Sequence, residues 1–182
     1  MEDLRIEHAD ITAEGSRALI DALDIELSAR YPEERVNVYS VEAWEVSSER
    51  GCFLSAIRGS NPVGCCALRR LTDGTGEIKR MFVTPAERGQ GVGKRLLLAI
   101  QREAHSLGIR RLVLETGVRQ PEAIGLYERF GFVRIPAFGE YVENPLSLCM
   151  GKEIAVESDE LPNRELPTDD RLGRFAPSAA RR

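Results

Sequence analysis

The sequence lacks the long apolar runs and the basic excess that would suit a membrane or a nucleic acid. No run approaches the roughly 18 apolar residues that a membrane span requires. The chain has 25 Lys and Arg residues against 29 Asp and Glu residues, a formal net charge of −4. A dedicated nucleic-acid binder normally shows the opposite balance. We therefore expect neither a membrane protein nor a nucleic-acid-binding protein.

Cysteine is scarce, and its spacing does not suit a disulfide framework or a zinc site. The four cysteines are Cys52, Cys65, Cys66 and Cys149, and no two have the C-x-x-C spacing. The adjacent Cys65 and Cys66 would point to opposite faces of a strand. The acidic start, Met1 to Arg5, lacks the apolar stretch of a signal peptide. These features predict a reduced, cytoplasmic protein without a bound metal.

The length of the chain fits one domain with a tail. It has 182 residues, of which 42% are hydrophobic, and this is enough for one packed core. From about Ala155 onwards apolar residues are sparse, prolines recur and no hydrophobic period persists. Such a segment buries too little surface to offset the entropy lost on ordering. We expect a domain over residues 1–154 and a disordered, charged tail over residues 155–182.

Strand and helix patterns alternate along the predicted domain. Apolar residues spaced by three or four predict helices over residues 12–28, 92–107 and 121–130. Gly108 and Gly131 follow the last two helices, where a left-handed residue commonly ends a helix. Together the elements predict an α/β (α+β) domain with a single mixed sheet. Alternating or continuous apolar residues predict strands over residues 4–8, 52–58, 63–71, 77–83, 112–115, 133–135 and 147–152.

The strongest chemical feature is the loop Arg88-Gly89-Gln90-Gly91-Val92-Gly93-Lys94, which lies between a strand and a long helix. Its glycines let the backbone approach a ligand, and successive N–H groups at a helix start bind anions. Arg95 follows Lys94 where a P-loop requires Ser or Thr. Lys94 also stands where a dinucleotide fingerprint requires its third glycine. The loop therefore predicts a phosphate or diphosphate site of another kind.

Two motifs in this order resemble the GNAT superfamily of acyl-CoA-dependent N-acetyltransferases. Arg88, Gly91 and Gly93 satisfy [QR]-x-x-G-x-[GA] at a helix start, and residues 123–132 satisfy A-[IV]-x-L-Y-x-x-x-G-F. The resemblance covers roughly residues 4–154. It implies a strongly twisted mixed β-sheet flanked by helices, in which two central strands splay apart to form the cleft for acetyl-CoA.

The resemblance also implies which residues contact the cofactor. The backbone of residues 81–83 would pair with the pantetheine arm of acetyl-CoA, and the glycine loop would hold its diphosphate. Gln120 stands where many members carry an asparagine that contacts the cofactor, and it keeps the amide on a longer side chain. The expected cofactor-binding residues are Met81, Phe82, Val83, Arg88, Gly89, Gln90, Gly91, Val92, Gly93, Lys94, Gln120 and Tyr127.

Acetyl transfer to an amine requires a base, because an amine with a pKa of about 10.4 is mostly protonated at neutral pH. Glu77 is the leading candidate, since some members carry a catalytic glutamate four residues before the equivalent of Met81. Glu115, at the end of the next strand, is the alternative, and some members use only ordered water. Either carboxylate could instead pair with a neighbouring base such as Lys79 or Arg80. Strand alternation places Glu77, Lys79 and Met81 on one face unless a bulge intervenes.

Tyr127 matches the tyrosine that points at the thioester sulfur in many members. A phenol with a pKa of about 10 does not readily protonate a thiolate whose thiol has a pKa of about 8.5. We therefore expect Tyr127 to donate a hydrogen bond to the departing sulfur. The basic residues expected near the cleft could hold an acceptor carboxylate, contact the 3′-phosphate of CoA or face solvent. They are Arg69, Arg70, Lys79, Arg80 and Arg119.

These features predict an acetyl-CoA-dependent N-acetyltransferase that moves an acetyl group directly to a primary amine of a small molecule. A protein or peptide N-acetyltransferase and a non-catalytic acyl-CoA-binding sensor are the alternatives, because the net charge does not distinguish the acceptors. A sensor would need the glycine loop but none of Glu77, Glu115 and Tyr127. The resemblance permits a homodimer, which no feature of the sequence fixes.

Overall fold

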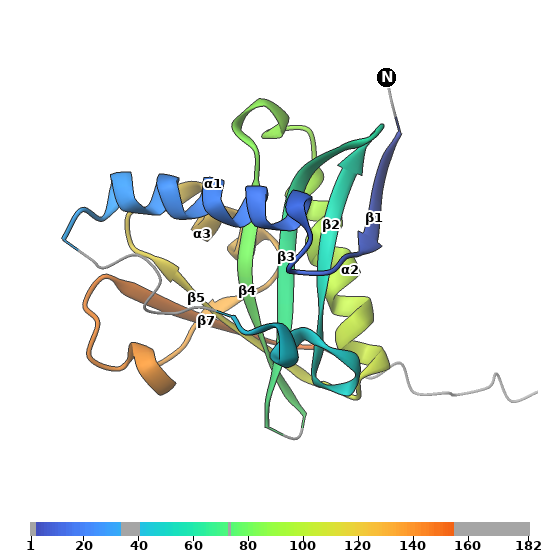
Figure 1. The fold of residues 1–182 in the computed structure, drawn as a ribbon. Helices are drawn as coiled ribbons and strands as arrows, with labels where there is room; N and C mark the ends of the chain where they lie inside the picture. Colours follow the sequence, from blue (N-terminus) through green and yellow to red (C-terminus); the bar gives the residue numbers. More distant parts are fainter. Residues whose placement is uncertain (1–2, 34–40, 73, 155–182) are drawn as a thin grey trace, which may run out of the picture.

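Seven strands form one mixed sheet in a computed structural model that describes residues 3–33, 41–72 and 74–154. The strand order is β1-β2-β3-β4-β5-β7-β6 (Figure 1). Neighbouring strands are antiparallel except β4 and β5, which run parallel. The predicted mixed sheet is confirmed, whereas the predicted tail lies outside the described residues. The strands are β1 (Leu4–His8), β2 (Gly51–Arg58), β3 (Asn61–Thr72), β4 (Thr75–Val83), β5 (Arg111–Gly117), β6 (Val133–Arg134) and β7 (Ser147–Glu153).

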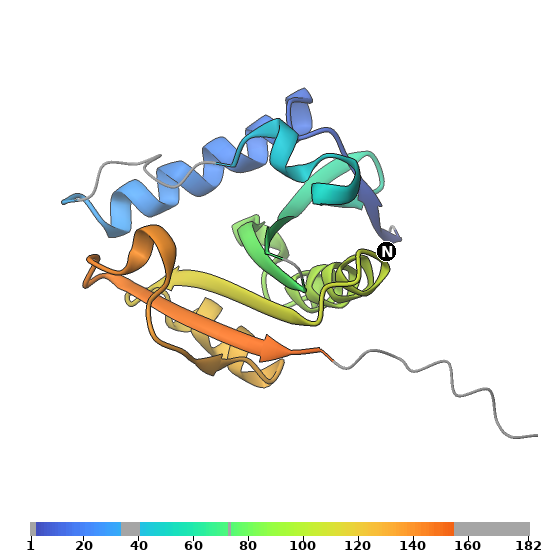
Figure 2. The same cartoon turned by 90° about the horizontal axis from the view of Figure 1, so that it is seen from below.

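Three α-helices cover the two faces of this sheet. Helix α1 (Glu14–Arg30) lies on one face, and α2 (Val92–Ser106) and α3 (Pro121–Arg129) lie on the other (Figures 1 and 2). Gly108 and Gly131 have φ angles of 68° and 81°, as their predicted place after α2 and α3 requires. No helix in the described ranges is long and apolar enough to cross a membrane. Four short 3₁₀ helices complete this part: η1 (Ala43–Val46), η2 (Ser48–Arg50), η3 (Pro85–Glu87) and η4 (Gly139–Tyr141).

The apolar stripes of the helices account for the packing on each face. Leu96 and Ile100 of α2 are fully buried in a cluster with Leu68 and Ile78 of the sheet. On the other face, α1 contributes to a smaller cluster with Phe82. Because each helix buries one side against the sheet, its opposite side is free to carry polar groups at the edges of the cleft.

The two central strands separate after a short parallel ladder. Pairing between β4 and β5 ends at Ile78 and Leu114, although β5 continues to pair with β7 as far as Gly117 and Ser147. Seen from below, the β5–β7 half of the sheet diverges from the β1–β4 half (Figure 2). The edge of β4 over residues 79–83 therefore has no β5 partner, although the Val83 carbonyl accepts a hydrogen bond from Arg88 at 3.0 Å.

A β-bulge in β4 decides which side chains share a face. Cys65 pairs with Phe82 but Ala67 pairs with Lys79, so Arg80 and Met81 together oppose one residue of β3. Arg80 has a φ of 53°, a left-handed value that is uncommon for a residue other than glycine. Because of this extra residue, Met81 packs into the α2 cluster whereas Phe82 packs into the α1 cluster. Simple alternation, which would put Met81 on the face of Lys79, therefore fails at this strand.

Candidate active site

The glycine loop is open toward solvent at the start of α2. Gly89 and Gly91 have φ angles of 77° and 79°, a conformation that glycine adopts without strain. A Cβ atom at either position would meet no atom within 4 Å. Gly91 directly precedes α2, whose first N–H groups lack helical partners and carry the positive end of the helix dipole. The loop therefore has the geometry that an anion site requires.

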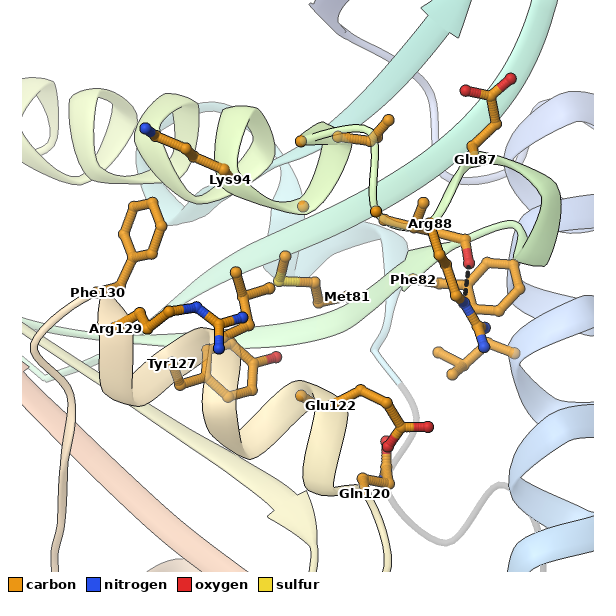
Figure 3. Close-up of a pocket in the computed structure, with 18 of the residues that line it drawn as sticks. Met81, Phe82, Glu87, Arg88, Lys94, Gln120, Glu122, Tyr127, Arg129 and Phe130 are labelled. Carbon is orange, nitrogen blue, oxygen red and sulfur yellow. Dashed lines mark hydrogen bonds between the residues drawn. The ribbon is translucent and has the colours of Figure 1, made fainter.

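A groove of about 960 Å³ extends from this loop between β4, α2 and α3 (Figure 3). All of the expected cofactor-binding residues line it except Gln90. The Gln90 side chain instead donates a hydrogen bond to the carbonyl of Ala86 and accepts one from Arg58. One groove thus joins the loop, the unpaired segment of β4 and the N-terminus of α3, which are far apart in the sequence.

Charged residues that neither motif indicates also line the groove. Glu26 of α1 accepts a hydrogen bond from Arg88 at 2.5 Å and lies 3.0 Å from Arg30. Arg30 in turn donates to Glu122 of α3 at 2.6 Å, and this hydrogen bond lowers the pKa of Glu122 to about 2. The four side chains connect the glycine loop through α1 to α3. The sequence pattern predicts α1 as a helix, but it does not indicate which parts of the protein the polar side of that helix contacts.

Tyr127 extends from α3 into the groove beside Met81 (Figure 3). Its side chain is only 6% exposed, and its ring packs edge-on against Phe132 with the centroids 5.8 Å apart. Burial raises the pKa of the hydroxyl above its ordinary value, and Cys66 and Glu115 add to the rise. The hydroxyl therefore stays protonated at neutral pH, which suits a hydrogen-bond donor better than an acid.

Glu77 lies enclosed outside the groove. Its side chain is 0% exposed, and one carboxylate oxygen accepts a hydrogen bond from Arg69 at 2.7 Å. The other oxygen accepts from the hydroxyl of Tyr141 at 2.6 Å, and Lys79 donates to the same hydroxyl at 2.8 Å. The ion pair that the sequence left open as an alternative role is present: Lys79, one of the two expected partners, lies 3.9 Å from Glu77, and Arg69 pairs with it more closely. Arg80, the other expected partner, pairs with Asp24 instead.

Glu115 occupies the point at which the central strands part. It directly follows Leu114, the last residue of β5 that pairs with β4, and it is partly exposed. Burial raises the pKa values of the Tyr31 and Tyr141 hydroxyls and of the Cys149 thiol, and the charge of Glu115 contributes to each rise. Like Glu77, Glu115 does not line the groove itself.

The five basic residues expected near the cleft are all engaged within the protein. Each already has an acceptor within the described residues, so an acceptor carboxylate would share it with that group. Their acceptors are Glu77, Glu45 and Glu140 for Arg69, the carbonyls of Glu49 and Leu107 for Arg70, Glu140 and Tyr141 for Lys79, Asp24 for Arg80, and Glu33 with the Arg30 carbonyl for Arg119. In the ranges that the structure describes, no three His, Cys, Asp or Glu side chains gather as a metal site.

Comparison with known proteins agrees with this geometry. Residues 17–132 match the model of the Acetyltransferase (GNAT) family. The chain is 42% identical over 137 residues to "IAA acetyltransferase" of Azospirillum brasilense. This alignment covers 75% of this chain and 88% of the relative.

Solved structures show the same fold. A candidate acyl-CoA N-acyltransferase from Klebsiella pneumoniae superposes with a TM-score of 0.72 at 31% identity, covering 84% of this chain and 98% of that one. A GNAT family acetyltransferase from Elizabethkingia anophelis, solved with acetyl-CoA bound, superposes with a TM-score of 0.61 at 18% identity, covering 85% and 100%. The chain therefore belongs to the acetyltransferase (GNAT) family of acyl-CoA-dependent enzymes.

Proposed function

We propose that this enzyme transfers an acetyl group from acetyl-CoA directly to a primary amine of a small molecule. The observation that carries the proposal is the groove itself, in which an open anion loop leads along an unpaired strand edge to Tyr127. The amine nitrogen forms a bond to the acetyl carbon, the carbon–sulfur bond breaks, and the amine gives up one proton to a base. CoA leaves as the thiolate.

The groove fits acetyl-CoA in two respects. The N–H groups of residues 89–94 would hold the diphosphate, since a Cβ atom at Gly89 or Gly91 would meet no other part of the protein within 4 Å and both glycines line the groove. The main chain of residues 81–83 would pair with the amides of the pantetheine arm, because it has no β5 partner. The acetyl-CoA bound to the Elizabethkingia anophelis protein, which shares the fold, supports this assignment.

We assign proton removal to Glu115 rather than to Glu77. A general base must reach the proton directly or through one water molecule. Glu77 is fully enclosed, and both of its oxygens already accept hydrogen bonds. Glu115 is partly exposed at the point of strand separation, so the amine or a bridging water molecule would reach it. Glu77 then serves to position Arg69 and Tyr141.

The groove also offers stabilisation for the two negative charges that develop during transfer. Tyr127 would donate a hydrogen bond to the departing thiolate, since its hydroxyl is protonated and its raised pKa disfavours full proton transfer. Within residues 81–83, the main-chain N–H groups that point away from β3 would donate to the carbonyl oxygen as it becomes anionic. Both are fixed before the substrate arrives, so little reorganisation is needed.

The charges on the α1 face favour a cationic amine as the acceptor. Around the parted strands, the three carboxylates of Glu45, Glu77 and Glu140 outnumber Arg69 and Lys79, the two cations with which they pair among the described residues. The name of the Azospirillum brasilense relative, "IAA acetyltransferase", supports a small molecule over a protein as acceptor.

The test is CoA release from acetyl-CoA with a panel of small amines, small acids and peptides that have free N-termini. We expect turnover with small cationic amines. Turnover restricted to peptides would contradict the small-molecule assignment. Tight binding of CoA without turnover of any acceptor would instead favour a sensor.

A further inference from the structure

The basic side chains that line the groove differ in how they are partnered. Arg30 and Arg88 belong to the ion-pair chain through α1, and Lys152 donates a hydrogen bond to a neighbouring side chain. Lys94 of α2 and Arg129 of α3 have no ion pair or hydrogen bond from their side chains to any residue that the structure describes. Among the basic side chains of the groove, these two are therefore the ones whose charge no carboxylate or other acceptor of the described residues engages.

Arg129 is directed along its own helix rather than away from it. A Cβ atom at Gly125 would lie 3.3 Å from Nη1 of Arg129, so the guanidinium folds back over Gly125. The side chain lies beside the groove in the direction of Tyr127 (Figure 3). Glycine within a helix is less favourable than alanine, because it loses more conformational freedom on folding. The sequence thus carries a residue unfavourable to the helix at the point where the arginine needs room.

The two ends of the groove differ in chemistry. Gln120 and Glu122 stand at one end, and Lys94, Arg129 and Phe130 gather at the other (Figure 3). Leu98, which also lines the groove, is 42% exposed, so this second end offers apolar surface beside positive charge. A purine needs such a flat apolar surface, and a phosphate needs an unpaired cation.

CoA carries two separate phosphate groups, a diphosphate and a 3′-phosphate on the ribose. The glycine loop offers a place for the first. We propose that Arg129 binds the 3′-phosphate, with Lys94 beside it, and thereby distinguishes CoA from dephospho-CoA. This inference rests on the proposed function, because it takes CoA as the ligand of the groove. The planar guanidinium can donate two parallel hydrogen bonds to phosphate oxygens.

The experiment measures the dissociation constants of CoA and dephospho-CoA by calorimetry for the wild type, Arg129→Gln and Arg95→Gln. Arg95 is the matched control, because it is an exposed arginine of α2 that does not line the groove. We expect the wild type to bind CoA about 10- to 100-fold more tightly than dephospho-CoA, as one charge-assisted phosphate contact permits. In Arg129→Gln this ratio should fall to about threefold or less, with the affinity for dephospho-CoA nearly unchanged. Arg95→Gln should keep the wild-type ratio.

The other outcomes overturn the inference separately from the proposed function. If Arg129→Gln weakens both ligands equally, the arginine contacts the diphosphate instead. If the wild type binds both ligands equally, Arg129 does not bind the 3′-phosphate. The same conclusion follows if Arg129→Gln keeps the wild-type ratio of the two dissociation constants. Failure of the wild type to bind CoA at all would contradict the proposed function itself. Circular dichroism of the variants checks that the exposed substitutions leave the fold intact.

Discussion

Arg69 and Glu77 face each other across β3 and β4, with Nε of the arginine 2.7 Å from Oε2 of the glutamate. The carboxylate has no solvent exposure, whereas Arg69 also reaches Glu45 on η1. The pair therefore ties the inner part of the sheet to the segment that covers it. A charge held in this way is expensive to leave without its partner, which determines how variants at position 77 should behave.

Glu77→Gln is expected to lower the free energy of unfolding by about 3 kcal/mol, because it leaves the guanidinium of Arg69 short of a buried counter-charge. Urea unfolding followed by circular dichroism measures the loss. Glu115→Gln serves as the comparison and should cost about 1 kcal/mol or less, since that side chain is partly exposed. Equal losses for the two variants would contradict the structural role of Glu77.

Glu115→Gln is expected to lower kcat about 100-fold or more, as the loss of a general base does. The amide keeps the size of the side chain but cannot accept the proton of the amine. Steady-state kinetics at saturating acetyl-CoA give the comparison with wild type, and the binding of CoA should be unaffected. If kcat stays at the wild-type level while chemistry limits the rate, Glu115 is not the base.

The parts of the candidate site that lie within one local sequence motif could be predicted. The parts that the fold assembles from distant segments could not. Loop residues 88–94 lie in a local motif whose anion-binding geometry follows from residue type and spacing, whereas the role of Tyr127 is an expectation that comes from the resemblance to the family. The bulge at Arg80 interrupts the alternation of side chains between the two faces of β4, and the apolar pattern of this strand does not predict it. Glu26 reaches the groove only because of how α1 docks on the sheet, which is a tertiary property.

Tyr127→Phe should lower kcat about 10- to 100-fold, the worth of one hydrogen bond to a charged sulfur. The dissociation constant of acetyl-CoA should change little, because the ring and its contact with Phe132 are retained. Burial raises the pKa of the hydroxyl, so wild-type kcat should show no decline from ionisation of Tyr127 as the pH rises from 8 to 10. An unchanged kcat for the variant in a chemistry-limited assay would exclude this role.

Glu26→Gln should tighten the binding of CoA by about two- to fivefold, a range typical of a partly exposed ion pair. The carboxylate holds the guanidinium of Arg88 and places negative charge beside the path of the diphosphate. Glu14→Gln is the matched control, since it removes the same charge from an exposed position in the first turn of α1. Calorimetry with CoA decides the matter. Weaker binding by Glu26→Gln would mean that Glu26 orients Arg88 for the ligand instead of competing with it.

The native thiols should react very slowly with DTNB at pH 8. Cys52, Cys65, Cys66 and Cys149 are all buried and unpaired. Burial raises each thiol pKa, to about 12 for Cys52 and Cys65. At such a pKa only about one thiol in ten thousand is ionised at pH 8, and the thiolate is the reactive form. The protein unfolded in guanidinium is the control and should release four equivalents. If one equivalent of thiol in the native protein reacted rapidly with DTNB, one cysteine would be accessible to solvent. If none does, DTNB can be used to follow CoA release without a background from the protein.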